Sequence, residues 1–146
     1  MFLVYTDGLA EPNPGVGTYG YSIYRDGKKI LSKYGFAGNP VTNNFAEYTG
    51  LLESLRVLRE WKEEEIRVFS DSKLLVGQMS GAWKVSKKAL RSKTEGSYAE
   101  KYLETKKEAE GFARLSFEWI PRELNAEADE LSRVAYREQL RKRRGR

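Results

Sequence analysis

The stretch Phe2–Gly8, FLVYTDG, gives the first evidence about the fold. Its first five residues, Phe2–Thr6, are mostly apolar and β-prone, and they predict a buried strand. The strand delivers one carboxylate, Asp7, followed at once by Gly8. An isolated charge in a dry site is costly unless something compensates it. Asp7 therefore either reaches solvent at a turn or is gathered with other charges around a cation.

The residues that follow predict an antiparallel meander of three strands. A loop rich in Gly and Pro, residues 10–17 (AEPNPGVG), precedes a second strand over Thr18–Arg25. Asp26-Gly27 is typical of a tight hairpin turn, and it leads into a third strand over Lys28–Phe36.

The rest of the chain alternates helices and strands. In order, we expect a helix from Phe45 to near Trp61, a strand over Glu65–Ser70, a helix from Ser72 to about Met79, a helix with Tyr98, Tyr102, Thr105, Ala109 and Phe112 on one face, a strand over Leu115–Ile120, and a helix from Asn125 to about Arg137. The order βββαβααβα predicts an α/β fold. Its mixed five-stranded sheet has three antiparallel strands, then parallel strands, with helices flanking it.

Composition excludes several kinds of chemistry. The chain has 146 residues, 40% of them hydrophobic, which fits one globular domain. It contains no Cys and no His, which excludes disulfides, thiolate chemistry, and the commonest general base and zinc ligand. No apolar run approaches the roughly 20 residues of a membrane span, and no secretion signal is evident. We therefore expect a cytoplasmic protein without a membrane partner.

Positive charge is concentrated at the C-terminal end. The formal net charge is +5, and the last ten residues, REQLRKRRGR, carry six basic side chains and one acid. We divide the chain into a domain over residues 1–140 and a basic tail over residues 141–146. Such a tail favours a polyanion partner such as nucleic acid, although a solvated end that only aids solubility has the same composition.

Four carboxylates occupy comparable places at the ends of elements. Asp7 ends the first strand and Asp71, within FSDSKLL, follows the fourth. Glu47, within TNNFAEY, lies in the first turn of the first helix, and Asp129, within NAEADELS, in the first turns of the last. Ligands of such sheets bind beyond the carboxyl ends of the strands, so these acids are expected to converge there.

Each acid also has a purely structural explanation. The four explanations are a turn at Asp7-Gly8, a capping box of Asn44 with Glu47, a helix cap by Asp71, and an i, i+4 ion pair of Asp129 with Arg133. The joint placement of the acids favours convergence over these separate explanations.

Convergence would require a cation, because neighbouring carboxylates cannot all stay ionised without one. A ligand set of oxygen atoms suits Mg²⁺ or Mn²⁺ far better than zinc or copper. Two such ions about 3.5–4 Å apart activate a water and stabilise the leaving oxygen of a phosphodiester. The pattern therefore favours magnesium-dependent phosphodiester hydrolysis.

Four segments together resemble the type 1 ribonucleases H, which cut the RNA strand of RNA–DNA hybrids. They are YTDGLAEPNPGVGTYG, VTNNFAEY, FSDSKLLVGQ and PRELNAEADELS, in the family's order and with suitable spacing. The resemblance covers residues 1–136. The loop PRELNAEAD and a short basic segment before it are similar to those of the archaeal-type subgroup with a short protrusion.

The resemblance implies the roles of the acids. Asp7, Glu47, Asp71 and Asp129 match the catalytic metal ligands of the family. Asp7 would bridge two Mg²⁺ ions, with Glu47 and Asp71 on one side and Asp129 on the other; Mn²⁺ is expected to substitute. Products with 5′-phosphate and 3′-hydroxyl ends are implied as well.

The resemblance also implies residues that bind the substrate. Asn13, Asn43 and Asn44, with the Gly8 backbone, match positions near the 2′-hydroxyls in the minor groove of the hybrid. Thr42 matches part of a pocket for a phosphate of the DNA strand. Turn chemistry for the first asparagine and helix capping for the last remain alternatives.

Two further assignments concern basic residues. The segment GAWKVSKKALRSK, residues 81–93, places Trp83, Lys87 and Lys88 as contacts to the DNA strand. A place for Trp83 in the core is the alternative. Many relatives carry a histidine before the last acid, and here Arg122 is the candidate to assist, by gripping a phosphate. A plain salt bridge is the alternative, and arginine cannot serve as a base because it stays protonated.

These observations together predict a monomeric endoribonuclease that acts on RNA–DNA hybrids with Mg²⁺. Double-stranded RNA remains open as a second substrate. Two rival functions keep the same fold: a non-catalytic module that binds hybrids, and a nuclease that acts on DNA. The four acids count against the first rival, and the asparagines that suit 2′-hydroxyls count against the second.

Overall fold

The computed structural model describes residues 1–91 and 97–144. The strands in these ranges are β1 (Phe2–Glu11), β2 (Gly15–Arg25), β3 (Lys28–Val41), β4 (Glu65–Ser70) and β5 (Arg114–Trp119). The helices are α1 (Asn43–Val57), α2 (Lys73–Met79), α3 (Lys87–Arg91), α4 (Tyr98–Ala109) and α5 (Ala126–Arg144), with short 3-10 turns at Arg59–Trp61 and Arg122–Asn125.

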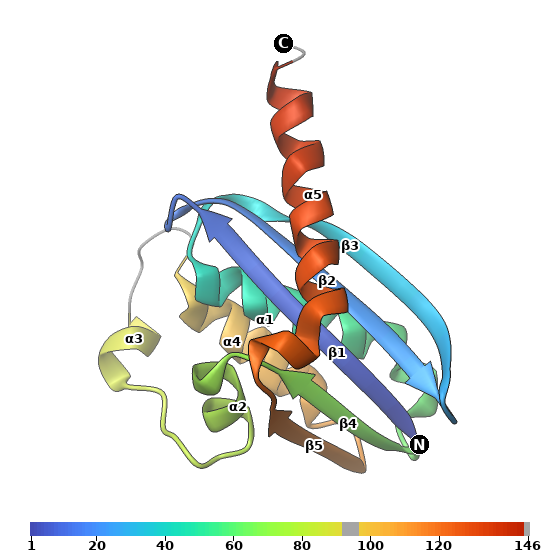
Figure 1. Ribbon diagram of the computed structural model, residues 1–146. Helices are drawn as coiled ribbons and strands as arrows, with labels where there is room; N and C mark the ends of the chain where they lie inside the picture. The colour runs from blue at the N-terminus through green and yellow to red at the C-terminus, as the bar shows by residue number, and fades with distance from the viewer. Residues whose placement is uncertain (92–96, 145–146) are drawn as a thin grey trace.

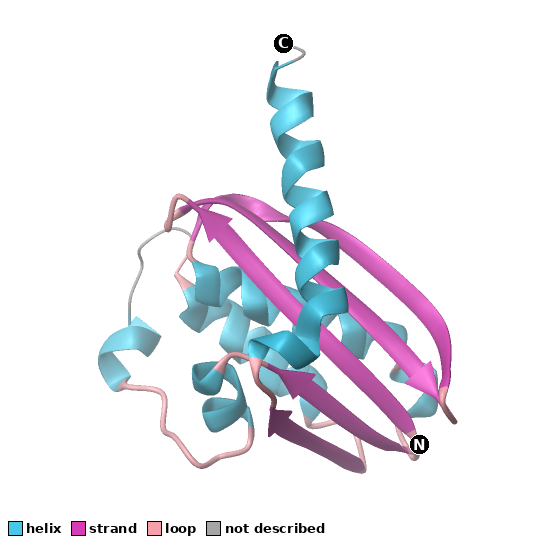
Figure 2. Ribbon diagram, in the orientation of Figure 1, coloured by secondary structure: helices cyan, strands magenta, loops and turns pink. Residues whose placement is uncertain are grey.

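The strands form one sheet in the order β3-β2-β1-β4-β5 (Figure 2). The first three strands pair antiparallel, and β4 pairs parallel with both β1 and β5. The predicted α/β fold, with three antiparallel strands followed by parallel ones, is confirmed. Because β1 and β4 are neighbours, Asp7 within β1 and Asp71 directly after β4 are brought to the same part of the sheet.

The antiparallel part is longer than the sequence predicted. The Asp26-Gly27 turn is confirmed, and both residues have the positive φ, 51° and 80°, that a tight hairpin requires. However, β1 and β2 remain paired as far as Glu11 and Val16, so the predicted loop over residues 10–17 shrinks to residues 12–14. Gly and Pro there suggested a loop, but backbone pairing does not depend on apolar side chains.

Helices cover the sheet from both sides (Figure 1). On one face α1 packs across β1 and β2 and is itself covered by α4, while α5 crosses β1, β2 and β3 on the other face. The core lies mainly between the sheet and α1. Its fully buried side chains include Phe2, Val4, Tyr48, Leu51 and Leu55.

Some predicted helix boundaries were wrong. The last helix continues past Arg137 to Arg144 and crosses the expected limit at residue 140 without interruption. The short helix α3 was not predicted; it lies in the basic segment 81–93, of which residues 92 and 93 fall outside the described residues, as do residues 145–146 of the tail. Among the described helices, none combines the length and apolarity needed to cross a membrane.

Candidate active site

The second half of β1 lies at an open edge of the sheet. β4 pairs with β1 only as far as the partners Tyr5 and Phe69, so β1 from Thr6 to Glu11 keeps β2 as its strand neighbour (Figure 1). Asp71 comes directly after the last residue of β4. A space therefore opens beyond the carboxyl end of β4, where sheets with parallel strands usually bind ligands.

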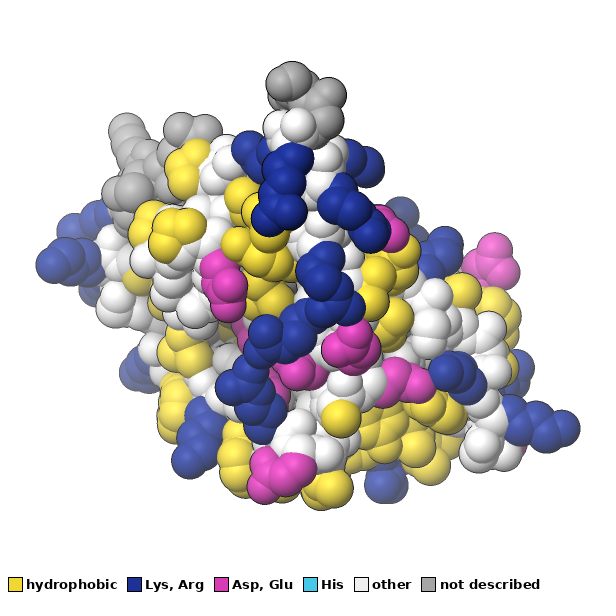
Figure 3. Space-filling model, turned by 45° about the horizontal axis from the view of Figure 1, so that its top comes forward, with side chains coloured by type: hydrophobic (Ala, Val, Ile, Leu, Met, Phe, Trp, Pro, Cys, Tyr) yellow, Lys and Arg dark blue, Asp and Glu magenta, His cyan; other side chains and the backbone are white. Residues whose placement is uncertain are grey.

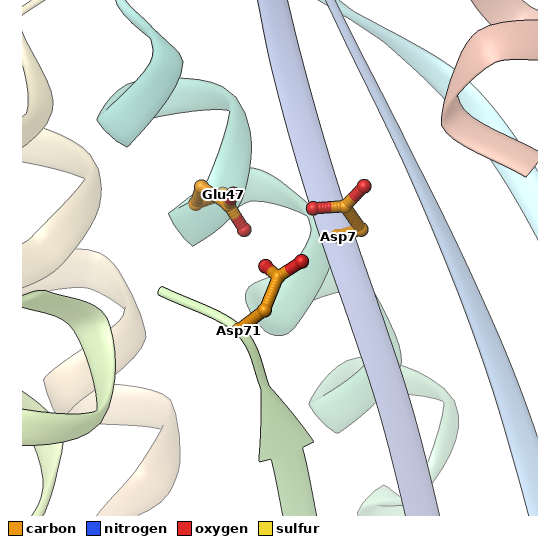
Figure 4. Close-up of side chains that lie close together, drawn as sticks. All are labelled: Asp7, Glu47 and Asp71. Carbon is orange, nitrogen blue, oxygen red and sulfur yellow. The ribbon is translucent and has the colours of Figure 1, made fainter. Parts of the chain in front are cut away.

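Three carboxylates meet in this space. Asp7 comes from β1, Glu47 from α1, and Asp71 from the segment after β4, and one oxygen of each lies within 4.8 Å of the others. Figure 4 shows the three side chains pointing toward one another. The structure thus brings together three of the four acids that the sequence singled out.

Gly8 explains how a helix residue reaches a strand residue. A Cβ atom on Gly8 would lie 2.5 Å from the backbone carbon of Ala46 and from the backbone nitrogen of Glu47. The backbone of α1 therefore rests directly on β1 at this point, which only glycine allows. This contact places the Glu47 carboxylate beside that of Asp7.

The structural alternatives for these three acids are wrong. Asp7 and Gly8 lie inside β1, not in a turn. The N-cap of α1 is Thr42, whose Oγ1 accepts a hydrogen bond from the Phe45 backbone, so neither a capping box with Glu47 nor an Asn44 cap forms. The N-cap of α2 is Ser72, not Asp71. Helix capping and turn formation therefore do not account for the three acids.

Asp129 approaches the same cleft from the opposite face of the sheet. Gly20, the β2 partner of Asp7, allows this, because a Cβ there would lie 2.4 Å from Cβ of Leu131 on α5. Ser132 Oγ donates to the Asp129 backbone oxygen at 2.7 Å and lies 3.3 Å from Asp7 Oδ2. Asp129 lines the cleft but is not in the group of three carboxylates within 4.8 Å.

Two arginines flank the Asp129 carboxylate. Arg133 Nε lies 3.3 Å from Asp129 Oδ2, as the i, i+4 spacing predicted, and an Arg122 terminal nitrogen lies 3.8 Å from Oδ1. Arg122 is 68% exposed, so its guanidinium remains accessible to a ligand while it neighbours the acid. The ion pair and the cleft position occur together, so a salt bridge does not exclude phosphate binding by Arg122.

The cluster is electrostatically strained without a cation. Burial raises the pKa of Asp7 to about 7, and the charges of Asp71 and Asp129 contribute to the shift. Burial, followed by the charges of Asp7 and Asp71, raises the pKa of Glu47 well above its usual value. The pKa of Asp71 is also raised by burial, an effect that the positive charge of Arg122 partly offsets. At neutral pH the cluster therefore favours taking up positive charge.

The arrangement fits a hard divalent cation. Among the described residues, Glu47 Oε2 is buried without a hydrogen-bond partner, so this oxygen is available as a metal ligand. The converging donor atoms are carboxylate oxygens, the ligands that Mg²⁺ and Mn²⁺ prefer. The cleft encloses about 470 Å³ in front of these atoms, enough for a substrate group to enter.

Of the predicted asparagines, Asn43 lines the cleft beside the carboxylates. Asn43 Oδ1 accepts a hydrogen bond from the Ala10 backbone at 2.7 Å, and Asn13 Oδ1 accepts one from the Asn43 backbone at 2.9 Å. The two oxygens therefore tie the β1–β2 hairpin to the start of α1. Asn13 and Asn43 are exposed, whereas Asn44 and Thr42 are half-buried beside them.

The predicted contacts to a DNA strand lie away from the carboxylates, on the α2–α3 side. The Trp83 ring packs on Gly77 of α2, where an added Cβ would lie 2.4 Å from Trp83 Cδ2. The side chain is nevertheless 49% exposed, so the alternative that places Trp83 in the core is wrong. Lys87 and Lys88 are exposed on α3.

Trp119 is a cleft residue that the sequence analysis missed. It pairs with Ser70 at the end of β5, and its Nε1 donates to the Asp71 backbone oxygen at 3.1 Å. Lys73 Nζ lies 5.0 Å from the centre of its ring. An aromatic residue at the carboxyl end of a strand beside β4 was the available signal. Arg133 was also missed as a cleft residue, because it was considered only as an ion-pair partner.

Comparison with known proteins gives a consistent result. Residues 1–137 match the family model of RNase H. The bifunctional protein Rv2228c of Mycobacterium tuberculosis is 35% identical over 134 residues, which cover 91% of this chain and 35% of that protein. Ribonuclease HI of Halobacterium salinarum is 29% identical over 131 residues, 90% of this chain and 62% of that protein. The chain thus spans about a third to two thirds of the length of these relatives.

Solved structures agree over nearly the whole chain. RNase H1 of Halobacterium salinarum superposes with a TM-score of 0.79 at 27% identity, covering 94% of this chain and 98% of the other. LC11-RNase H1, solved in complex with an RNA/DNA hybrid, gives 0.77 at 32% identity, covering 96% and 99%. With its fold, its carboxylate cluster and its family match in agreement, the chain belongs to the RNase H family, among the type 1 ribonucleases H.

Proposed function

We propose that this chain is a magnesium-dependent endoribonuclease that hydrolyses the RNA strand of RNA–DNA hybrids and leaves 5′-phosphate and 3′-hydroxyl ends. The observation that carries the proposal is the convergence of Asp7, Glu47 and Asp71 in a cleft at the sheet edge. Two buried acids and one half-buried acid that repel one another are unfavourable for binding a polyanion by themselves and favourable for binding divalent cations. The similarity to LC11-RNase H1, whose structure contains a hybrid, supports the choice of substrate.

The acidic residues of the cleft bind the metal, and a basic residue beside them binds the substrate phosphate. Asp7, Glu47, Asp71 and Asp129 hold the metal, with Mn²⁺ able to replace Mg²⁺. When bound, two such ions activate a water molecule and stabilise the leaving oxygen. Arg122, which is exposed and beside Asp129, offers a guanidinium fork to a substrate phosphate. Because arginine remains protonated, Arg122 positions charge and transfers no proton.

The rim of the cleft recognises the hybrid. Asn13 and Asn43 use their side-chain oxygens within the protein, and their amide N–H groups remain the donors suited to 2′-hydroxyls and minor-groove edges. Asn44 and the Gly8 backbone complete this rim, and Thr42 contributes to a site for a DNA-strand phosphate.

On the α2–α3 side, Trp83, Lys87 and Lys88 contact the backbone of the DNA strand, with the half-exposed indole as a stacking surface and the two lysines as phosphate partners. Contacts of these kinds do not depend on base identity. We therefore expect cleavage without sequence preference.

The test compares labelled RNA–DNA hybrid, double-stranded RNA and double-stranded DNA, each with Mg²⁺, Mn²⁺ or EDTA. We expect cleavage of the hybrid with either metal, none with EDTA, and ends that a 5′-phosphate-dependent exonuclease accepts. Cleavage of DNA alone would instead identify a DNA-directed nuclease. Tight hybrid binding without cleavage under every metal condition would identify a binding module and refute the catalytic proposal.

A further inference from the structure

The last helix carries a row of positive charge along one side. Arg133, Arg137, Arg141 and Arg144 follow one another at spacings of four, four and three residues, so their side chains neighbour each other along α5. We call these four residues the α5 stripe. Figure 3 shows Lys and Arg side chains that extend from the acidic side chains near the cleft along α5 toward the C-terminus.

The stripe begins inside the cleft and becomes more positive outward. Arg133 lines the cleft and pairs with Asp129. Arg137 lies 2.7 Å from Glu130, but both side chains are more than half exposed, so the pair contributes little and can open. Arg141 and Arg144 are exposed in the last turns, where the sequence is almost purely basic.

Contacts to β3 hold this helix in place almost to its end. Tyr34 on β3 donates a hydrogen bond to Glu138 at 2.7 Å. Five residues further along α5, the Arg143 guanidinium lies beside the Asn39 side-chain amide, also on β3. The stripe is therefore presented on a braced helix, whose orientation relative to the cleft is set by the sheet.

We propose that the α5 stripe binds successive phosphates of the substrate duplex on one side of the cleavage site and so lengthens the catalytic cleft. The proposal rests on the proposed function, because the duplex is taken to be the RNA–DNA hybrid. At 1.5 Å per residue, Arg133 and Arg144 are separated by about 16 Å along the helix. At about 3.4 Å per base pair, this length corresponds to roughly five base pairs of duplex.

The test measures how hybrid binding depends on salt. The stripe variant changes Arg137, Arg141 and Arg144 together to Gln. The matched control variant changes Lys28, Arg67 and Lys107 to Gln; these residues are exposed on β3, β4 and α4. Both triple variants lose the same charge, and Arg133 is kept because it touches Asp129. The variants are made in the Asp7→Asn background so that the hybrid stays intact, and circular dichroism checks their folding.

We expect the stripe variant to bind a long hybrid at least about tenfold more weakly at low salt. The slope of log affinity against log salt should fall by about 2 to 3, because each lost phosphate contact removes about 0.9. The control variant should change this slope by less than about 1. Equal slope changes in the two triple variants would mean that only net charge matters, and would overturn the proposal.

A second arm locates the stripe on the substrate. Hybrids that share one central segment are extended by about five base pairs on the 5′ side or on the 3′ side. The two triple variants should differ in salt slope with only one of the two extended hybrids. The same difference in slope with both hybrids would overturn the proposal that the α5 stripe binds on one side of the cleavage site. Wild-type cleavage is scored separately. Absent cleavage with a retained slope difference would refute the proposed function and leave the stripe standing.

Discussion

The two halves of β1 differ in their neighbours, and this difference locates the site. Phe2–Tyr5 pairs with β2 on one side and β4 on the other, and its Phe2 and Val4 side chains are completely buried. Thr6–Glu11 pairs with β2 but extends past the end of β4. The first half contributes to the core, and the second half carries Asp7 and borders the cleft.

Side chains take the place of the missing strand along the second half. Asn125 Nδ2 donates to the Thr6 backbone oxygen at 3.0 Å, and Asn43 Oδ1 accepts from the Ala10 backbone nitrogen at 2.7 Å. Between them, a hydrogen bond from the Gly8 backbone lowers the pKa of both Asp7 and Glu47, against the larger effect of burial. Backbone groups that a strand would satisfy are thus available to carboxylates at this strand edge.

Replacing Asp7 by Asn gives the largest expected effect, because it removes the acid at the centre of this edge. Hybrid cleavage should fall about a thousandfold or more, since the residues of such a cluster act as a unit. The fold should remain, because Asn occupies the same volume. Cleavage rates with saturating Mg²⁺ and far-ultraviolet circular dichroism test both statements.

Asp26→Asn is the matched control for this substitution. Asp26 lies in the β2–β3 turn at a φ of 51°, a conformation that Asn also tolerates, and it lies outside the cleft. This variant should cleave at the wild-type rate. Near-normal turnover by Asp7→Asn would remove the basis for the metal site, whatever the control does.

The raised pKa of Asp7 in the second half of β1 predicts that the stability of the fold depends on pH in the absence of metal. The pKa of Asp7 is about 7 in the folded chain and 3.8 as its ordinary value, so the folded state binds the proton more tightly. The stabilisation is complete below about pH 4 and is lost as the pH rises through about 7. The full effect is on the order of 4 kcal/mol, because one pKa unit corresponds to about 1.4 kcal/mol.

Urea unfolding in EDTA between pH 4 and 8 measures this effect as the difference between wild type and Asp7→Asn. Wild type should lose stability relative to the variant as the pH rises, and Mg²⁺ should restore it at pH 8 by favouring the ionised carboxylates. A constant difference across this range would show that the Asp7 proton is not linked to folding.

Gly8→Ala tests the close approach that brings Glu47 to the edge. The new Cβ would lie 2.5 Å from the α1 backbone, so the helix must shift. We expect destabilisation of about 1–3 kcal/mol and a loss of activity of up to about a hundredfold, since misplacement by about 1 Å has effects of this size. In the control, Gly111→Ala, the nearest atom would be the flexible end of Lys62 at 3.1 Å. Equal losses in both variants would contradict the role given to Gly8.

The strand and helix order could be read from the sequence because side-chain periodicity reports which face is buried. Glu65–Ser70 was predicted with its observed limits, since its apolar residues and flanking polar residues mark both ends. The first strand was ended too early at Thr6 and Ala10–Glu11 were read as part of a loop, because the pairing of these residues with β2 depends on backbone hydrogen bonds and not on apolar side chains. In the same way α5 was ended too early at Arg137, since nothing apolar marks its exposed last turns.

The convergence of the acids was also predictable, but the reasons for it were not. The predicted positions of Asp7 and Asp71 at strand ends pointed to a common edge once the first and fourth strands were taken as neighbours, although Asp7 lies within the longer β1. The contact of Gly8 with α1 and the bond of Trp119 to the Asp71 backbone depend on how distant elements pack. Packing of this kind leaves no periodic signal in a single sequence.

The smallest expected effect comes from separating the two roles of Asn43. Asn43→Ala leaves the Ala10 N–H without its partner and should cost about 1 kcal/mol of stability and raise KM several-fold. Asn43→Asp keeps an acceptor for Ala10 but lacks the amide donor for the hybrid. It should therefore retain more stability than Asn43→Ala while still raising KM. Equal stability of the two variants would show that Asn43 does not replace a strand neighbour of β1, and the two halves of β1 would then differ in pairing alone.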